Sequence, residues 1–365
     1  MKYIDEFRDP KLARRLIAHI KRRATEPMRF MEFCGGHTHA IMRYGLRQLL
    51  PANIKMLSGP GCPVCVTSCT DLDRAIALAR IPGVILTTFG DMLRVPGSDG
   101  TLSGAKAEGA DVRMVYSTLD AVQCARDNPD RPVIFLGIGF ETTAPTVAAS
   151  ILQAERAGIH NYYVFSLHKL TPPAMRAILD GGEVALSGIL GPGHVTTIIG
   201  SQAWAFLPEE YGMPCAVAGF ESLDILRAVA MLTDMLVESR PAVANAYPRS
   251  VRREGNPSAQ EIMYRVFQVT PADWRGIGTL PGSGLGLREE FDHRDAALVF
   301  PIEIGPPHEP KGCRCGDVLR GALSPTECPL FANRCTPTSP LGPCMVSSEG
   351  ACAAYFTYRE YKDDH

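Results

Sequence analysis

Residues 133–158 read VIFLGIGFETTAPTVAASILQAERAG and decide the fold class. The apolar run at the start is typical of a strand buried on both faces, and the turn after it leads into a stretch with helical periodicity. The same order recurs around MRFMEF, IKMLS, VILTTF, VRMVY and YYVFSL. Strands and helices that alternate in this way form parallel sheets covered by helices. The sequence therefore predicts an α/β fold with two Rossmann-like parallel-sheet domains.

Composition suggests how the chain is divided. The polar, glycine-rich segment PGSDGTLSGAKAEGA ends shortly before residue 115, and NAYPRSVRREGNP after Arg240 is typical of a linker. We expect one α/β domain over 1–115, a second over 116–240 with a cleft between the two, and a C-terminal domain over 241–365. In the C-terminal domain we expect a single helix around AQEIMYRVFQV, and loops from LPGSGLGL onward.

Bulk properties argue against several classes of protein. The chain has 365 residues, with 37 Lys and Arg against 39 Asp and Glu, and no basic stripe that would predict a nucleic-acid partner. It is charged from its second residue, lacks an apolar signal region and has no apolar run near the roughly 18 residues that span a bilayer. We expect a cytoplasmic protein without membrane contact. In that reducing compartment its twelve cysteines favour cluster, metal or redox chemistry over structural disulfides.

Six of these cysteines lie close together near the C-terminus. Four follow the spacing C-x12-C-x6-C-x16-C, namely Cys315, Cys328, Cys335 and Cys352. The other two, Cys313 and Cys344, are further thiols in the same segment. Four thiolates from loops suit a [4Fe–4S] cluster or a structural Zn²⁺. The long gaps differ from the close pairs of structural zinc sites and favour the cluster. Unligated thiols are the remaining alternative.

The motif GPGCPVCVTSC places Cys62 and Cys65 in a CxxC pair before a predicted helix. The positive end of a helix dipole stabilises a thiolate, so the pair predicts reversible disulfide chemistry. A second metal site with Cys69 is the alternative, although the helix leaves few further ligands nearby. Cys69 can equally be a buried, inert thiol.

The motif EFCGGHTH brings Cys34 to the end of a predicted strand, with His37 three residues later. Two glycines allow a ligand to approach the backbone. A thiolate and an imidazole suit a nucleophile pair or a soft iron or copper site. A Cys–His protease also needs an orienting Asn or Asp and an oxyanion hole, and neither is identifiable. His39 is equally suited to packing.

Three more loops follow predicted strands. GDMLRVPGSDG contains Asp91, GFETTAPT contains Glu141 and GILGPGHV contains His194. Each residue alone can be an ordinary cap or turn residue, but we expect the three together to line the cleft. No GxxxxGK[ST] or GxGxxG occurs, which weakens the case for a nucleotide site.

The motifs together resemble the HypD family of hydrogenase maturation proteins over nearly the whole chain. They are EFCGGHTHAI, SGPGCPVCVTS, TTFGDMLRVPGS, FLGIGFETTAPT, GPGHV and the tail from CRCGDVLRG through CPLFANRCTP to GPCMVSSEGACAAY. The resemblance implies a scaffold that pairs with the small chaperone HypC and gives iron its CO and two cyanides. It further implies HypE, charged by HypF, as the cyanide donor, and delivery to the large subunit of a [NiFe]-hydrogenase through HypC.

The resemblance also implies roles for individual residues. Cys34 would bind the transient Fe(CN)2CO unit together with the N-terminal cysteine of HypC, and His37 would lie beside it. Cys62 and Cys65 would be a redox-active pair, and the tail cysteines would hold a [4Fe–4S] cluster, with either Cys313 or Cys315 as a ligand. Such a protein is an assembly scaffold with redox activity rather than a conventional enzyme. Two alternatives are a cluster-dependent disulfide reductase similar to ferredoxin-thioredoxin reductase and a zinc-stabilised binding protein.

Overall fold

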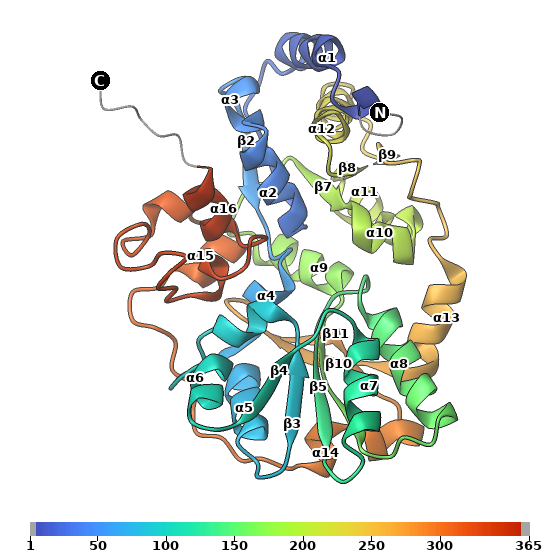
Figure 1. The fold of residues 1–365 in the computed structure, drawn as a ribbon. Coiled ribbons are helices and arrows are strands. Elements are labelled where there is room, and N and C mark those ends of the chain that lie inside the picture. Colours follow the sequence, from blue (N-terminus) through green and yellow to red (C-terminus); the bar gives the residue numbers. More distant parts are fainter. Residues whose placement is uncertain (1–4, 359–365) are drawn as a thin grey trace.

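Two parallel sheets organise the protein, which the computed structural model describes over residues 5–358 (Figure 1). The four-stranded sheet has the order β4-β3-β5-β6, with bounds Asp111–Met114, Ile85–Thr88, Val133–Gly139 and Tyr162–His168. The five-stranded sheet has the order β2-β1-β7-β8-β9, with bounds Ile54–Ser58, Met28–Glu32, Gly188–Pro192, Cys215–Ala218 and Val243–Asn245. The predicted α/β class is confirmed.

The five-stranded sheet combines two distant parts of the chain. β1 and β2 precede the four-stranded sheet and β7 to β9 follow it, and β1 pairs with both β2 and β7. The boundary expected near residue 115 therefore falls inside the four-stranded sheet, directly after β4, and does not separate the two sheets. Hydrophobic periodicity identifies strands one at a time and does not show which strands pair, so the return of the chain to β1 was not predictable from it.

Helices cover both faces of each sheet because successive strand residues point to opposite sides. On the five-stranded sheet, Phe30 belongs to a core with one helical layer and Met31 to a core with the other. The first layer consists of α1 (Pro10–Arg23), α2 (Gly35–Arg43), α3 (Leu46–Leu49) and α12 (Ser222–Val237); the second consists of α9 (Thr171–Gly181), α10 (Gly193–Ile199) and α11 (Phe206–Tyr211). The four-stranded sheet lies between α5 (Cys69–Ala79) with α6 (Leu102–Ala107), and α7 (Thr118–Asp127) with α8 (Ala144–Arg156) and α13 (Pro257–Val266).

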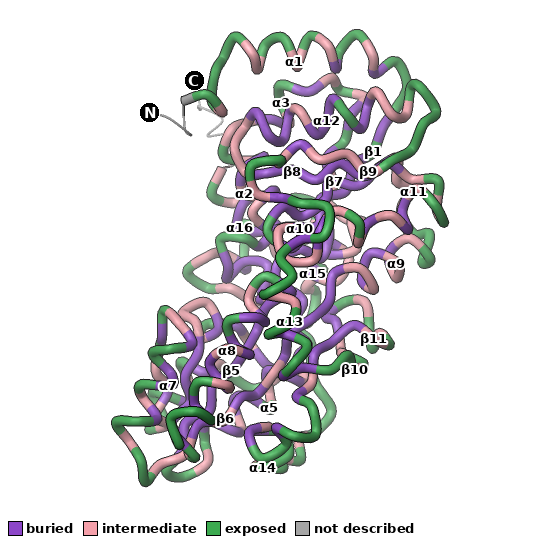
Figure 2. Tube along the Cα trace, turned by 90° about the vertical axis from the view of Figure 1, so that its right-hand side faces the viewer, coloured by how far each residue is buried: buried purple, intermediate pink, exposed green. Residues whose placement is uncertain are grey.

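Local sequence sets the ends of α1. The Asp9 carboxylate accepts the N–H of Lys11 at 2.7 Å, Pro10 occupies the first helical position, and the last turn is basic. Each of these features stabilises a helix terminus. Only one face of α1 packs against α12, so the helix is largely exposed (Figure 2). Within residues 5–358, no helix is both long and apolar enough to cross a membrane.

The chain after Arg240 is more regular than expected. α13 ends at Val266 and leads directly into β10 (Phe267–Trp274), which pairs antiparallel with β11 (Gly278–Leu287). The prediction that loops begin at LPGSGLGL is therefore wrong, because this segment belongs to β11. Its glycines argue against a strand, yet they serve close packing here, because a Cβ at Gly284 would lie 2.7 Å from the Cβ of Ala272.

The remaining tail is loop-rich, as predicted, but the expectation of a single helix is wrong, because the tail also carries α14 (Ala296–Val299), α15 (Cys315–Leu319) and α16 (Ala351–Thr357). These helices are too short to show a helical period in the sequence. Short 3-10 helices occur at Asp5–Phe7, Gly90–Arg94, Ser201–Trp204, Glu289–Arg294, Pro325–Glu327 and Pro343–Met345. One hydrophobic core connects this tail to both sheets, since it contains Met31 of β1, Leu136 of β5 and Cys335 of the tail. Sheets and tail are thus packed as one body.

Candidate functional site

A cavity of about 520 Å³ lies between the two sheets. Its walls come from the loops that follow β1, β2, β3, β4, β5 and β7, and from residues 347–349 of the tail. Loops at the carboxyl ends of parallel strands are where α/β proteins bind ligands. The cleft was expected between residues 1–115 and 116–240, whereas the cavity lies between the two sheets, and Cys34, Asp91 and His194 all line it.

Cys34 lies where β1 ends and α2 begins. Its loop is bound to the loop after β2, because the Gly35 N–H donates to Gly61 O at 2.9 Å. Cβ atoms at these glycines would clash: one at Gly61 would lie 2.2 Å from Cys34 N, and one at Gly36 would lie 2.9 Å from the Phe220 ring. Glycine at these positions allows three loops to meet around the thiol.

The surroundings of Cys34 favour a neutral thiol. Burial raises the pKa of Cys34, and the negative charge of Glu349, which also lines the cavity, raises it further. Burial also raises the pKa of Glu32 to about 8. The Glu32 carboxyl accepts the Cys34 N–H at 3.1 Å and the hydroxyl of Thr38. A metal that takes Cys34 as a thiolate must therefore displace its proton.

His37 lies behind the cavity wall rather than in it. Its Nε2–H donates to Ala218 O and Gly219 O, both at 3.1 Å, and burial lowers its pKa to about 4. Nδ1 is buried and makes no hydrogen bond within residues 5–358. His37 and His194 both stack on Phe220, at ring-centroid distances of 4.8 and 4.0 Å. The neutral His37 ring thus connects α2 to the loop after β8.

Glu141 does not line the cavity, contrary to expectation. Its carboxyl is buried and accepts the N–H and the hydroxyl of Thr171 at 2.8 and 2.9 Å, at the start of α9. Burial raises its pKa to about 7. The next two residues, Thr142 and Thr143, line the cavity in its place, since the chain turns into α8 there. Glu141 therefore connects β5 to α9.

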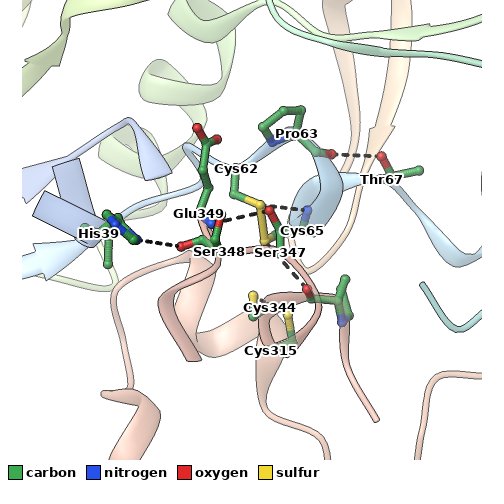
Figure 3. The surroundings of a disulfide bond; sticks show 12 residues. His39, Cys62, Pro63, Cys65, Thr67, Cys315, Cys344, Ser347, Ser348 and Glu349 are labelled. Carbon is green, nitrogen blue, oxygen red and sulfur yellow. Dashed lines mark hydrogen bonds between the residues drawn. A yellow bond between two sulfur atoms is a disulfide. The ribbon is translucent and has the colours of Figure 1, made fainter. Parts of the chain in front are cut away.

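Cys62 and Cys65 form a disulfide at α4 (Pro63–Val66), as Figure 3 shows. Both cysteines are buried, whereas Pro63 and Val64 between them line the cavity. The disulfide therefore lies directly behind the cavity wall. Cys69 is not part of this pair.

All six tail cysteines line one small cavity of about 20 Å³, whose other walls are mainly apolar. The sulfurs of Cys315 and Cys344 are 2.7 Å apart. Pro343 O lies 3.9 Å from the Cys65 sulfur, so this cysteine cluster lies next to the disulfide (Figure 3). Within the described residues, no three potential ligands stand close enough to hold a single metal ion. The hydrogen bond with Cys344 lowers the pKa of Cys315, and the charge of Arg275 lowers it further against the effect of burial.

Sequence reasoning missed four residues of this region: Glu32, Phe220, Arg275 and Glu349. Glu32 carried a signal, because a carboxylate at the end of an apolar strand is rarely buried without a reason. Glu349 lies in the tail motif GPCMVSSEGACAAY, in which the two cysteines are the stronger signal. Phe220 and Arg275 have no local signal, since their importance comes from segments far away in the sequence.

Fold and site together define a class of α/β thiol protein, in which a free cysteine lines the cavity between the sheets and a buried disulfide separates it from a cysteine cluster. The family described as "HypD: Hydrogenase formation hypA family" matches residues 11–359. Hydrogenase maturation factor HypD of Azotobacter vinelandii is 53% identical over 98% of this chain and 97% of its own length. The proteins of that name from Cupriavidus necator and Escherichia coli K12 are 48% and 43% identical, over the whole of this chain and 98% and 100% of theirs. The chain belongs to the HypD family of hydrogenase maturation factors.

Proposed function

We propose that this protein is the scaffold on which iron receives two cyanides and CO before insertion into a [NiFe]-hydrogenase. HypC forms a complex with it in the cytoplasm and delivers the product to the large subunit of the hydrogenase. HypE, charged by HypF, donates the cyanide. The observation that carries the proposal is the position of Cys34. Among the described residues it is the one cysteine that lines the cavity between the sheets.

The cavity offers what the assembly of such a unit needs. Low-spin iron with cyanide and CO ligands favours soft thiolate donors. Cys34 supplies one, with the N-terminal cysteine of HypC as a second. Thr142 and Ser348 line the same cavity, and a side-chain hydroxyl there can donate to the nitrogen end of a cyanide. Its largely apolar walls, among them Phe33, limit the access of water.

The tail cysteines are proposed to hold a [4Fe–4S] cluster, with Cys315, Cys328, Cys335 and Cys352 as ligands. The donor set fits, because six thiols converge within an apolar shell. The enclosed space is about 20 Å³, so the loops that carry the thiols must move apart around a cluster. When bound, the cluster supplies one-electron transfer. The neighbouring disulfide of Cys62 and Cys65 opens to two thiols by taking up two electrons and two protons, the electrons coming from an external low-potential donor protein.

The anchor is tested by anaerobic co-purification with HypC and infrared spectroscopy. Bands of bound cyanide and CO are expected for the wild type and are expected to disappear in Cys34→Ala. Cys124→Ala is the matched control, because Cys124 is a half-buried thiol of α7 that does not line the cavity. Undiminished bands in Cys34→Ala would refute the anchor.

A cluster-dependent disulfide reductase is the second candidate, favoured by the position of the disulfide beside the cysteine cluster. In that function a protein substrate must reach the disulfide, but Cys62 and Cys65 are only 3% and 0% exposed. Turnover of a generic disulfide substrate by the isolated protein with a chemical reductant would support this candidate. The scaffold proposal expects none.

A further inference from the structure

Arg275 is a buried cation without a hydrogen-bond acceptor. Its side chain is 2% exposed, and none of its three guanidinium nitrogens makes a hydrogen bond within the described chain. Its ion-pair contact is to Glu309, with Nε 3.2 Å from Oε1, but the Glu309 side chain is 55% exposed. A buried charge is costly unless a nearby opposite charge compensates it. Arg275 therefore lacks most of the compensation that its burial requires.

Backbone contacts hold Arg275 between the disulfide turn and the cysteine cluster. Its N–H donates to Val66 O, at the end of α4, at 2.9 Å. The next residue, Gly276, has φ of 78° and packs against Gly316, so that a Cβ on Gly276 would lie 2.4 Å from Gly316 Cα. Gly316 directly follows Cys315 in α15. The turn between β10 and β11 thus contacts both the end of α4 and the helix that carries Cys315, and Arg275 lies in this turn.

Other arginines near the tail differ in this respect. Arg320, just after the helix that carries Cys315, pairs with Glu183 and Asp317. Arg334 precedes Cys335 and is exposed to water. Water or carboxylates compensate both of these cations. The charge of Arg275, in contrast, acts on the thiols of Cys315 and Cys69.

We infer that Arg275 is a positioning charge that compensates an iron–sulfur cluster held by the tail cysteines and raises its reduction potential. The inference rests on the cluster of the proposed function. A thiolate-bound cluster carries net negative charge that grows on reduction, and nearby charge and burial tune its potential. A fixed positive charge in a water-poor site stabilises the reduced state more than the oxidised state. Arg275 makes the cluster easier for the external donor protein to reduce, and it lowers the driving force of the following step from cluster to disulfide by the same amount.

The test is redox titration of the anaerobically reconstituted full chain, followed by visible and electron paramagnetic resonance spectra. Arg275→Met is expected to shift the one-electron equilibrium toward the oxidised cluster at least tenfold, which is about 59 mV toward a more negative potential. Arg275→Lys keeps the charge, so its potential should lie close to that of the wild type. Arg334→Met is the matched control and should leave the potential unchanged. Equal potentials in the wild type and Arg275→Met would overturn the inference.

Arg275→Gln keeps the test decisive if Arg275→Met does not fold. Its amide is polar but neutral, so the potential is expected to become more negative as in Arg275→Met. An unchanged or higher potential would count against the role of Arg275. Iron and labile sulfide analysis separates the two levels of failure. A wild type without four irons and sulfide overturns the cluster itself, whereas a complete cluster that is insensitive to Arg275 overturns only this inference.

Discussion

Cys34, His37 and Glu141 have in common that burial favours the neutral form of each side chain. Their roles still differ. Cys34 lines the cavity, while His37 and Glu141 connect loops behind it. The carboxyl groups that line the cavity are those of Asp91 and Glu349, and under the proposed function the loss of the Cys34 proton adds the thiolate that binds iron.

Glu141→Gln is expected to reduce the pH dependence of stability. The pKa of Glu141 is about 7 in the folded protein against an ordinary value of 4.5, so its contribution is complete below 4.5 and is lost as the pH rises through 7. At about 1.4 kcal/mol per pKa unit, the free energy of unfolding of the wild type should fall by about 3 kcal/mol over this interval. That of Glu141→Gln should not show this fall. Tyr264, whose pKa is raised by burial and by Glu141, titrates above it. Urea unfolding at either end of the interval measures the difference, and parallel curves for the two proteins would contradict the assignment.

At the scale of elements, two loops that follow neighbouring strands form one unit. The loop after β1 carries Cys34, the loop after β2 carries the disulfide, and the Gly35 to Gly61 hydrogen bond joins them. Their parallel strands are in register from Met28 opposite Ile54 to Glu32 opposite Ser58. Both thiol motifs therefore leave the sheet at the same level and in fixed relation.

Gly61→Ala is expected to disturb this unit. The added methyl group would lie 2.2 Å from Cys34 N and 2.3 Å from the carbonyl carbon of Phe33, and backbone atoms cannot yield as a flexible side chain can. Overpacking of this kind typically costs about 1–3 kcal/mol. The free energy of unfolding from urea denaturation measures it. Gly181→Ala is the control, because nothing lies within 4 Å of its added methyl group and α9 should tolerate alanine. Equal stability of Gly61→Ala and the wild type would show that the two loops can separate freely.

The sequence predicted the order of the strands and helices better than the directions in which individual side chains point. Alternating apolar runs and amphipathic stretches indicated the strands and the loops that carry Cys34, Asp91 and His194, because the edge of a parallel sheet follows from local pattern. The inward turn of Glu141 was not predictable, since it depends on the packing of α9. The buried position of Arg275 depends on a hairpin that meets α4 far away in the sequence.

At the scale of the whole molecule, one core contains strands of both sheets and the tail cysteines. The cavity with Cys34, the disulfide and the cysteine cluster follow one another through this core. A substitution at one of these sites should therefore change the stability and the redox properties of the neighbouring site.

Cys335→Ala is expected to abolish the visible absorption of a cluster in anaerobically prepared protein and to lower its thermal midpoint. Cys335 is buried and lines the cavity of the cysteine cluster, and its loop packs into the shared core. Absorption spectra, iron analysis and thermal unfolding measure the effect, with Cys124→Ala as the control thiol. A Cys335→Ala protein that keeps four irons would remove this residue from the ligand set.

Because β1 pairs with β7, the order of synthesis governs when the loop that carries Cys34 can form. The four-stranded sheet, complete at His168, is available for folding on the ribosome before β7 emerges at Gly188. Until then β1 lacks its neighbour on one side, and the loops with Cys34, Cys62 and Cys65 cannot close against the later residues that bury them. These thiols therefore pass through a period of exposure in the nascent chain, in which a reducing environment protects them from mispairing.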